Sequence, residues 1–373
     1  MARHFRIPGH HGLLEAVKTI PCNFSLYSEK VATSGSGRSH RGIRATWLGH
    51  AGFLVQLPPV AADEPPMRIV FDPIFSERAS PSTWFGPRRW IDAPCKANEL
   101  PTVNFVVISH NHYDHLDIAA LKDIYGHSST IHFLVPLGIK ALLLDELPCL
   151  SQSQVQELDW WENRRFPSSD GRTTVEFVCT PAQHNSGRGL FDQSHTLWAS
   201  WVVRQLAGPE ENGEHGNRSD ELPYSSIYFA GDTGYQTASG PCPVFKEIGG
   251  KYGPFDLAML PIWRGASLSF LGNMGLRLTE EATENLLSTL HASPADAVEI
   301  AFDVHARHTL AMHFGTFCGS DDEAVLPLAE LNDALKKRHP HLRDKIGPRG
   351  CWREEGGFGA IDVGETIFVR CSR

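Results

Sequence analysis

Several kinds of segment are missing from this 373-residue sequence, and each absence removes a class of protein. No stretch approaches the roughly 20 consecutive apolar residues that a transmembrane helix needs. The N-terminus carries basic residues but no apolar run long enough for a secretory signal peptide. We therefore expect an intracellular protein, cytoplasmic or peripheral to an organelle membrane, that is neither secreted nor membrane-spanning.

Motifs that would indicate other chemistries are missing as well. The eight cysteines include no Cys-x-x-Cys pair, which argues against a zinc finger and a dense disulfide framework and makes a reducing compartment the default. No Gly-x-Ser-x-Gly motif is present, so nothing indicates a serine nucleophile. The net charge of −9 disfavours a broad nucleic-acid-binding surface.

The most informative segment that is present covers residues 108–117, Ile-Ser-His-Asn-His-Tyr-Asp-His-Leu-Asp. It follows a run of β-branched and aromatic residues at 103–108 that predicts a buried strand, and alternate positions after a strand can turn toward one point. Imidazole nitrogens and a carboxylate suit zinc or another first-row metal, such as manganese or iron. Chance clustering of surface histidines is the weaker alternative. The candidate ligands are His110, His112, Asp114 and His115.

Two metal ions need about seven or eight donors once water is counted, so further ligands must come from elsewhere in the chain. Three later segments each place a ligand at the end of an apolar run. Alone, each signal is weak, because a single histidine after a strand is more often structural and Gly-Asp-Thr-Gly more often marks a turn. Their shared setting favours a common site. The added candidates are His184, Asp232 and His313.

With further stretches between Ala45 and Leu335, these motifs resemble the metallo-β-lactamase fold hydrolases and their His-x-His-x-Asp-His signature. Within that family the sequence is most similar to the N-acylphosphatidylethanolamine-hydrolysing phospholipases D. The stretches include Leu48-Gly49-His50-Ala51, Phe71-Asp72-Pro73 and Gly253-Pro254-Phe255-Asp256. The resemblance implies an α/β protein with the αβ/βα four-layer sandwich of that fold.

The resemblance also implies two Zn²⁺ ions per chain, or another first-row divalent metal. His110, His112 and His184 would hold one ion. Asp114, His115 and His313 would hold the other, and Asp232 would bridge them. Metal-bound hydroxide would then hydrolyse a phosphodiester of N-acylphosphatidylethanolamine to N-acylethanolamine and phosphatidic acid, with Asp114 or Asp232 steering the hydroxide proton.

The substrate is less strongly indicated than the metal chemistry. The rim at 83–87 and at 262–274 differs from the animal enzymes of the family, so hydrolysis of an ester, lactone or amide of a soluble metabolite stays open. A non-enzymatic binding protein is disfavoured, because all seven ligand positions are present. Peripheral membrane contact and a homodimer are both compatible with the chain. The expected substrate contacts are Thr83, Trp84, Tyr113, Trp263 and His291.

Two further histidines stand in motifs of the family. His291 aligns with a histidine near the active-site mouth, and we expect it to donate a proton or to contact substrate. His50 lies in the Leu-Gly-His-Ala turn, where a structural or ligand-positioning role is as well supported as a catalytic one.

The chain divides into a lead segment at 1–44 and a hydrolase domain at 45–373, with a polar surface-loop insertion at 208–220. Strands at 45–57 and 68–72 are expected to form a hairpin with a proline-rich tip. Capping residues and periodicity predict helices at 117–124, 137–145, 279–290, 294–304 and 324–338.

Overall fold

The computed structural model describes residues 4–5, 14–27, 42–59, 66–189, 191–208, 223–263 and 289–372. Two of the sequence predictions therefore lie largely outside the described residues. The insertion at 208–220 is described only at residue 208, and the helix at 279–290 only at its last two residues, which are helical.

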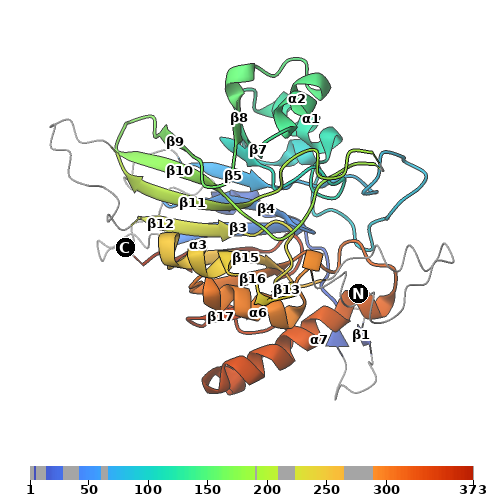
Figure 1. The fold of residues 1–373 in the computed structure, drawn as a ribbon. Coiled ribbons are helices and arrows are strands. Elements are labelled where there is room, and N and C mark those ends of the chain that lie inside the picture. Colours follow the sequence, from blue (N-terminus) through green and yellow to red (C-terminus); the bar gives the residue numbers. More distant parts are fainter. Residues whose placement is uncertain are drawn as a thin grey trace.

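Two seven-stranded sheets pack face to face at the centre of the molecule (Figure 1). In spatial order the first sheet contains β17 (Gly357–Gly359), β16 (His308–Met312), β15 (Leu257–Pro261), β12 (Ser225–Phe229), β11 (Ser200–Ala207), β10 (Thr173–Thr180) and β9 (Asn163–Pro167). The second contains β18 (Thr366–Arg370), β3 (Gly42–Gly49), β4 (Gly52–Gln56), β5 (Arg68–Phe71), β6 (Phe105–Val107), β7 (His132–Pro136) and β8 (Val155–Leu158).

Each sheet is mixed, with a parallel half and an antiparallel half. Strands β5 to β8 run parallel in the second sheet, as do β12, β15, β16 and β17 in the first. Parallel strands are covered on both faces and are therefore continuously apolar. Two short antiparallel pairs lie outside the sheets: β1 (His4–Phe5) with β2 (Leu14–Glu15), and β13 (Gln236–Thr237) with β14 (Gly240–Pro241).

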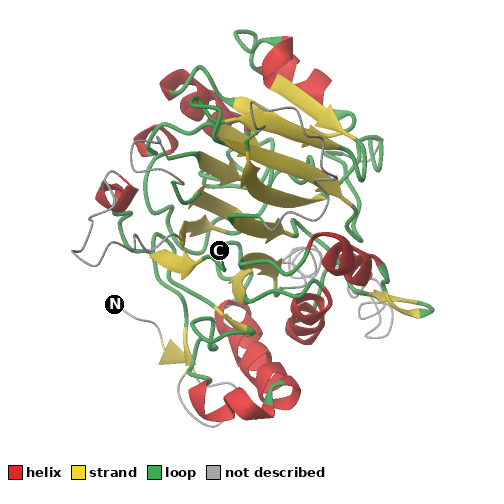
Figure 2. Ribbon diagram, turned by 90° about the vertical axis from the view of Figure 1, so that its left-hand side faces the viewer, coloured by secondary structure: helices red, strands yellow, loops and turns green. Residues whose placement is uncertain are grey.

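Helices cover the outer faces of the two sheets, as the view in Figure 2 also shows. The α-helices are α1 (Ile118–His127), α2 (Ile139–Glu146), α3 (Val244–Tyr252), α6 (Pro294–Asp303) and α7 (Asp321–Arg338). Short 3₁₀ turns are η1 (Phe24–Tyr27), η2 (Ala97–Glu99), η3 (Gln152–Gln154) and η5 (Pro340–Lys345). Helices α1 and α2 lie against the second sheet, and α3, α6 and α7 lie beside the first (Figure 1). The predicted four-layer sandwich is confirmed.

The main hydrophobic core fills the space between the sheets, where Phe71 of β5 meets Phe229 of β12 with ring centroids 4.8 Å apart. A second core lies between α1, α2 and the second sheet. Both cores consist largely of fully buried side chains, so the ends of the strands are held rigidly. Loops that follow those strands therefore start from fixed positions.

Four of the predicted helices are confirmed as α1, α2, α6 and α7, and the predicted cap at Ser293 is confirmed for α6. The Ser293 side chain accepts a hydrogen bond from the Asp296 amide at the start of α6, where Pro294 takes the first helical position. Helix α7 begins with three acidic residues and ends with three basic residues, as the helix dipole favours.

The predicted strand at 45–57 is wrong as a single element. The structure divides it into β3 and β4, which pair antiparallel around a tight turn at His50, whose φ is 51°. The predicted pairing of this region with the next strand is confirmed, because β4 pairs antiparallel with β5. Strand β3 begins at Gly42, within the predicted lead segment, and the division at residue 44 stays a prediction.

Among the helices that the structure describes, none is both long enough and apolar enough to cross a membrane.

Candidate metal centre

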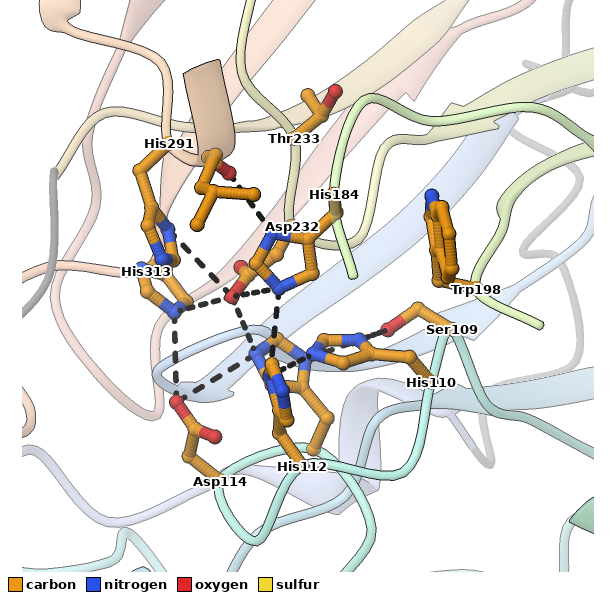
Figure 3. A network of polar contacts seen from close by, with 12 residues as sticks. Ser109, His110, His112, Asp114, His184, Trp198, Asp232, Thr233, His291 and His313 are labelled. Atoms are coloured by element: carbon orange, nitrogen blue, oxygen red, sulfur yellow. Dashed lines mark hydrogen bonds and ion pairs between the residues drawn. The ribbon is translucent and has the colours of Figure 1, made fainter. Parts of the chain in front are cut away.

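Every candidate ligand lies just after a strand, at the same end of the two sheets. Strand β6 leads into the cluster at 110–115, β10 into His184, β12 into Asp232 and β16 into His313. In layered α/β proteins, loops at the carboxyl ends of parallel strands form the binding crevice. Figure 3 shows His110, His112, Asp114, His184, Asp232, His291 and His313 pointing toward one another.

One group of donors consists of His110, His112, His184 and Asp232. The Nε2 atom of His110 lies 2.8 Å from Nδ1 of His112, and Nε2 of His184 lies 3.4 Å from the same Nδ1 atom. The Oδ2 atom of Asp232 is 3.6 Å from Nε2 of His184. Three imidazole nitrogens and one carboxylate oxygen are a donor set that suits zinc.

A second group consists of His50, Asp114, His115 and His313. The carboxylate of Asp232 also reaches this group, because its Oδ2 atom lies 3.2 Å from Nε2 of His115 and 3.0 Å from Nε2 of His313. The Asp114 Oδ2 atom is 3.6 Å from Nε2 of His313. Asp232 therefore stands between the two groups, where the sequence interpretation put a bridging ligand.

The buried polar atoms of this centre fit a bound cation. Among the described residues, Nε2 of His115, Nε2 of His313 and Oδ1 of Asp232 have no aligned hydrogen-bond partner although they are buried. A buried polar atom without a partner costs free energy, and a divalent cation between the nitrogens and the carboxylate would satisfy all three.

In the ligand rings of His110, His115 and His184, the nitrogen that points away from the centre, Nδ1, contacts a neighbouring oxygen atom. The Nδ1 atom of His115 lies 2.7 Å from Oδ2 of Asp72, and Nδ1 of His184 lies 2.9 Å from the Leu290 carbonyl oxygen. Nδ1 of His110 lies 2.8 Å from the Ser109 hydroxyl. Such contacts leave Nε2 free to face the centre and fix the tautomer that a metal requires.

Three residues of the centre and its surroundings have sterically unfavourable backbone conformations. His50, Asp72 and His313 have φ angles of 51°, 35° and 58°, in the left-handed region that non-glycine residues rarely adopt. Gly231 precedes the shared carboxylate with φ 58°, and a Cβ there would lie 2.5 Å from Cβ of Ser109. Only glycine lets the β12 and β6 loops approach so closely.

The electrostatics of the centre attract positive charge. Burial holds the pKa of His110 and His184 well below the usual value, so both rings are neutral near pH 7. Burial would also lower the pKa of His115 and His313, but the neighbouring Asp232 and Asp114 carboxylates override it. The pKa of His115 rises well above its usual value, and that of His313 rises to about 9.

The pKa values of the Asp232 and Asp114 carboxylates shift in the opposite direction, downward. Burial alone would raise the pKa of Asp232 and Asp114, but the adjacent imidazoles, His115 first, hold both well below the usual range. Both carboxylates are therefore ionised near pH 7. Without a cation, protons on the imidazoles balance this negative charge.

Of the predicted substrate contacts, the structure brings His291 into the centre. Its Nδ1 atom lies 3.8 Å from Oδ2 of Asp232, and its ring stacks on His313 with centroids 5.4 Å apart. Burial lowers the pKa of His291 to about 4, so its ring is neutral near pH 7.

Thr83 and Tyr113 line a cavity of about 570 Å³ beside the metal centre. Other residues of this lining include Ser80, Ser82, Asp117 and Arg188, but none of the seven candidate ligands. Tyr113 lies between two of those ligands, His112 and Asp114, in sequence. The Arg188 guanidinium lies 4.1 Å from the centroid of the Tyr113 ring.

The two predicted tryptophan contacts lie apart from this lining. Trp84 is exposed in the loop at 72–104, and Trp263 is half-buried against the main core. The rest of the predicted rim beyond Trp263, at 264–274, lies outside the described residues.

Sequence reasoning missed residues that position the ligands. Asp72 and Ser109 were given no role, although Asp72 follows β5 in the same way that Asp232 follows β12. That shared pattern of a strand followed by an aspartate was the available signal. His50 is an additional donor in the second group, and its Nε2 atom lies 2.9 Å from Oδ2 of Asp114. No periodicity in the sequence indicates this contact.

Comparisons with known proteins agree with this geometry. The family model of the Beta-lactamase superfamily domain matches residues 67–314. N-acyl-phosphatidylethanolamine-hydrolyzing phospholipase D 1 of Caenorhabditis elegans is 35% identical over 336 residues, which cover 89% of this chain and 78% of the worm protein. The mitochondrial protein of the same name from Saccharomyces cerevisiae is 29% identical over 71% of this chain and 47% of its own length.

Solved structures show the same fold at low sequence identity. Isothiocyanate hydrolase from Delia radicum gut bacteria superposes with a TM-score of 0.51 at 16% identity, covering 87% of this chain and 98% of the other. This likeness supports the fold alone. The family match, the sequence identity to the worm protein and the His/Asp centre show that the chain belongs to the β-lactamase superfamily of metal-dependent hydrolases, within which it is similar to the N-acyl-phosphatidylethanolamine-hydrolyzing phospholipases D.

Proposed function

We propose that this chain is a dizinc phosphodiesterase that hydrolyses N-acylphosphatidylethanolamine to N-acylethanolamine and phosphatidic acid. The observation that carries the proposal is the position of Asp232 between two groups of donors, each able to hold one cation. The name of the worm relative, which is similar over most of the chain, supports the substrate.

Seven residues would hold the two cations. His110, His112 and His184 would bind one, Asp114, His115 and His313 the other, and Asp232 both. His50 would support the second group by its hydrogen bond to Asp114. When bound, the two cations lower the pKa of water toward neutrality and neutralise charge on the phosphodiester oxygens.

Hydrolysis adds the oxygen of water to phosphorus and breaks the bond from phosphorus to the ethanolamine oxygen. We assign the proton of the attacking water to Asp114, because its side chain is 29% exposed whereas that of Asp232 is 2% exposed. A carboxylate at the mouth of the centre can accept a proton and pass it to solvent.

The leaving ethanolamine oxygen needs a hydrogen-bond donor. We assign this contact to His291, which stacks on His313 at the edge of the centre. Its ring is neutral near pH 7, since burial lowers its pKa to about 4, but an anionic phosphate oxygen beside it would raise that pKa again. His291 can then share its proton with the leaving oxygen.

The cavity beside the centre combines apolar lining with polar groups that support a charged head group as ligand. The Arg188 guanidinium, which lies over the Tyr113 ring, belongs to the lining of this cavity and brings a positive charge to it. The Tyr113 ring and the Thr83 side chain lie on the same cavity. A guanidinium beside hydroxyl groups is typical of sites that bind phosphate.

Exposed aromatic side chains near this cavity support a lipid substrate. Trp84 and Phe85 are 82% and 77% exposed and follow Thr83 directly in the chain. Large exposed aromatic side chains are costly in water and are favoured at membrane surfaces. We propose that they contact the lipid surface from which substrate is taken.

The proposal is tested by incubating metal-loaded protein with N-acylphosphatidylethanolamine vesicles and following phosphatidic acid and N-acylethanolamine by mass spectrometry. Parallel samples contain a lactone, a carboxylic ester and an amide of soluble metabolites. Release of both lipid products in equal amounts supports the proposal. Hydrolysis of only the soluble compounds would support the alternative function, a metallohydrolase of soluble metabolites.

A further inference from the structure

Two cysteines that are far apart in sequence come together outside the metal centre. Cys22 lies in the N-terminal segment just before η1, and Cys95 lies in the loop at 72–104 between β5 and β6. Both are half-buried and pack against the core beneath α1 and α2, as do Phe24 and Phe75.

The two segments that carry these cysteines are held side by side. The Thr19 hydroxyl donates a 2.7 Å hydrogen bond to the Asp92 carbonyl oxygen. Ile20 and Pro94 meet at one glycine, since a Cβ on Gly364 would lie 1.9 Å from the Ile20 carbonyl oxygen and 3.0 Å from the Pro94 Cβ. These contacts hold together the residues next to the two cysteines in sequence.

The two thiols interact with each other, because each one shifts the pKa of the other. The segments on either side of the two cysteines are already held together, so rotation of the cysteine side chains is the movement that a disulfide between them requires. Both residues are half-buried, so neither cysteine is enclosed in the core.

We propose that Cys22 and Cys95 form a dithiol modification site that small-molecule disulfides, such as glutathione disulfide, oxidise to an intrachain disulfide. The site is separate from the candidate ligands and independent of the proposed hydrolase function.

Cys22 is the attacking thiol. The hydrogen bond from Cys95 lowers the pKa of the Cys22 thiol, and the same contact followed by burial raises the pKa of Cys95. The Cys22 thiolate attacks one sulfur of glutathione disulfide, which releases one glutathione thiolate and leaves a mixed disulfide. Cys95 then loses its proton to solvent, attacks the Cys22 sulfur and releases the second glutathione. Two protein thiols are oxidised, and one disulfide is reduced to two thiols.

The crosslink would join the N-terminal segment to the loop that carries Thr83 and Trp84. It would also close a loop of about 70 residues in the unfolded chain, which removes conformational entropy from the unfolded state. We therefore expect oxidation to raise the melting temperature by roughly 5 °C, reversibly with a thiol reductant.

The test treats the full-length protein with glutathione buffers of increasing oxidised fraction. Free thiols are blocked by alkylation, and peptides are then analysed by mass spectrometry without reduction. We expect Cys22 and Cys95 to lose their thiols together and to appear as one crosslinked peptide. The Cys149→Ser variant is the matched control, because Cys149 is exposed and its loss should leave the crosslink unchanged.

The single variants separate the two steps. In Cys95→Ser we expect Cys22 to stop at the mixed disulfide with glutathione, and in Cys22→Ser we expect Cys95 to stay reduced. The proposal is overturned if both thiols stay reduced in the most oxidising buffer, or if either one pairs with another cysteine instead. An unchanged melting temperature on crosslinking would contradict the expected link between the two segments.

Discussion

The Nδ1 atom of His115 lies 2.7 Å from Oδ2 of Asp72, and both side chains are fully buried. Asp72 also accepts a hydrogen bond from the Ser109 amide at 2.7 Å, so its carboxylate is held from two directions. The arrangement fixes the imidazole with Nε2 toward Asp232. A metal centre of this kind depends on the acceptor behind each ligand as well as on the ligand itself.

Replacing Asp72 with asparagine removes the charge behind His115 while keeping the size of the side chain. We expect the affinity for Zn²⁺ to fall by about 10- to 100-fold, because such an acceptor orients the ring and raises its basicity. Competition with a chromophoric chelator measures this affinity. Asp123→Asn on the exposed face of α1 is the control and should leave it unchanged.

Replacing His291 with glutamine should lower kcat by about 100-fold or more while leaving two metal ions bound, because we place His291 at the leaving oxygen and not among the ligands. Turnover and metal content are measured on the same preparation. A parallel loss of metal would show instead that His291 is a ligand, a role that its grouping with Asp232 and His313 also permits.

Metal binding should release protons near pH 7. The pKa of His313 is raised to about 9 and that of His115 is raised well above its usual value, so the metal-free chain holds protons on both rings at neutral pH. A cation must displace them, and the release should disappear as the pH rises through and beyond the pKa of each ring. Calorimetric titration with Zn²⁺ in buffers of different ionisation enthalpy measures the protons released. Binding heats near pH 7 that are independent of the buffer would argue against this charge balance.

Alanine at both Trp84 and Phe85 should weaken binding to phospholipid vesicles by at least about tenfold, since each exposed ring would lose apolar area buried in the lipid surface. Vesicle sedimentation measures the effect. Phe302→Ala is the matched control, because that ring is also exposed but lies at the end of α6, away from the cavity. Equal weakening by both variants would point to a nonspecific effect.

The part of the centre that could be predicted from the sequence consists of the ligands that directly follow an apolar strand. His110, His184, Asp232 and His313 each follow an apolar strand, so their convergence could be predicted from the common end of the sheets. The helix starts were similarly predictable, because the cap of α6 is local in sequence.

Contacts between segments that no pattern links could not be predicted. The approach of His50 to Asp114 joins the turn between β3 and β4 to the loop that follows β6, and no sequence pattern links these two segments. The meeting of Cys22 with Cys95 depends on how an N-terminal segment packs against a long loop. Both contacts depend on tertiary packing, which residue spacing and secondary-structure propensity do not predict.

The central claim is that two cations sharing Asp232 carry phosphodiester hydrolysis. The most direct measurement compares the wild-type chain with Asp232→Asn for bound zinc and for phosphatidic acid formed from N-acylphosphatidylethanolamine, on the same samples. The account predicts about two zinc ions per wild-type chain, and in the variant fewer ions and no detectable lipid product. Wild-type protein with full metal content and no phosphatidic acid, or an Asp232→Asn variant with unchanged activity, would contradict it.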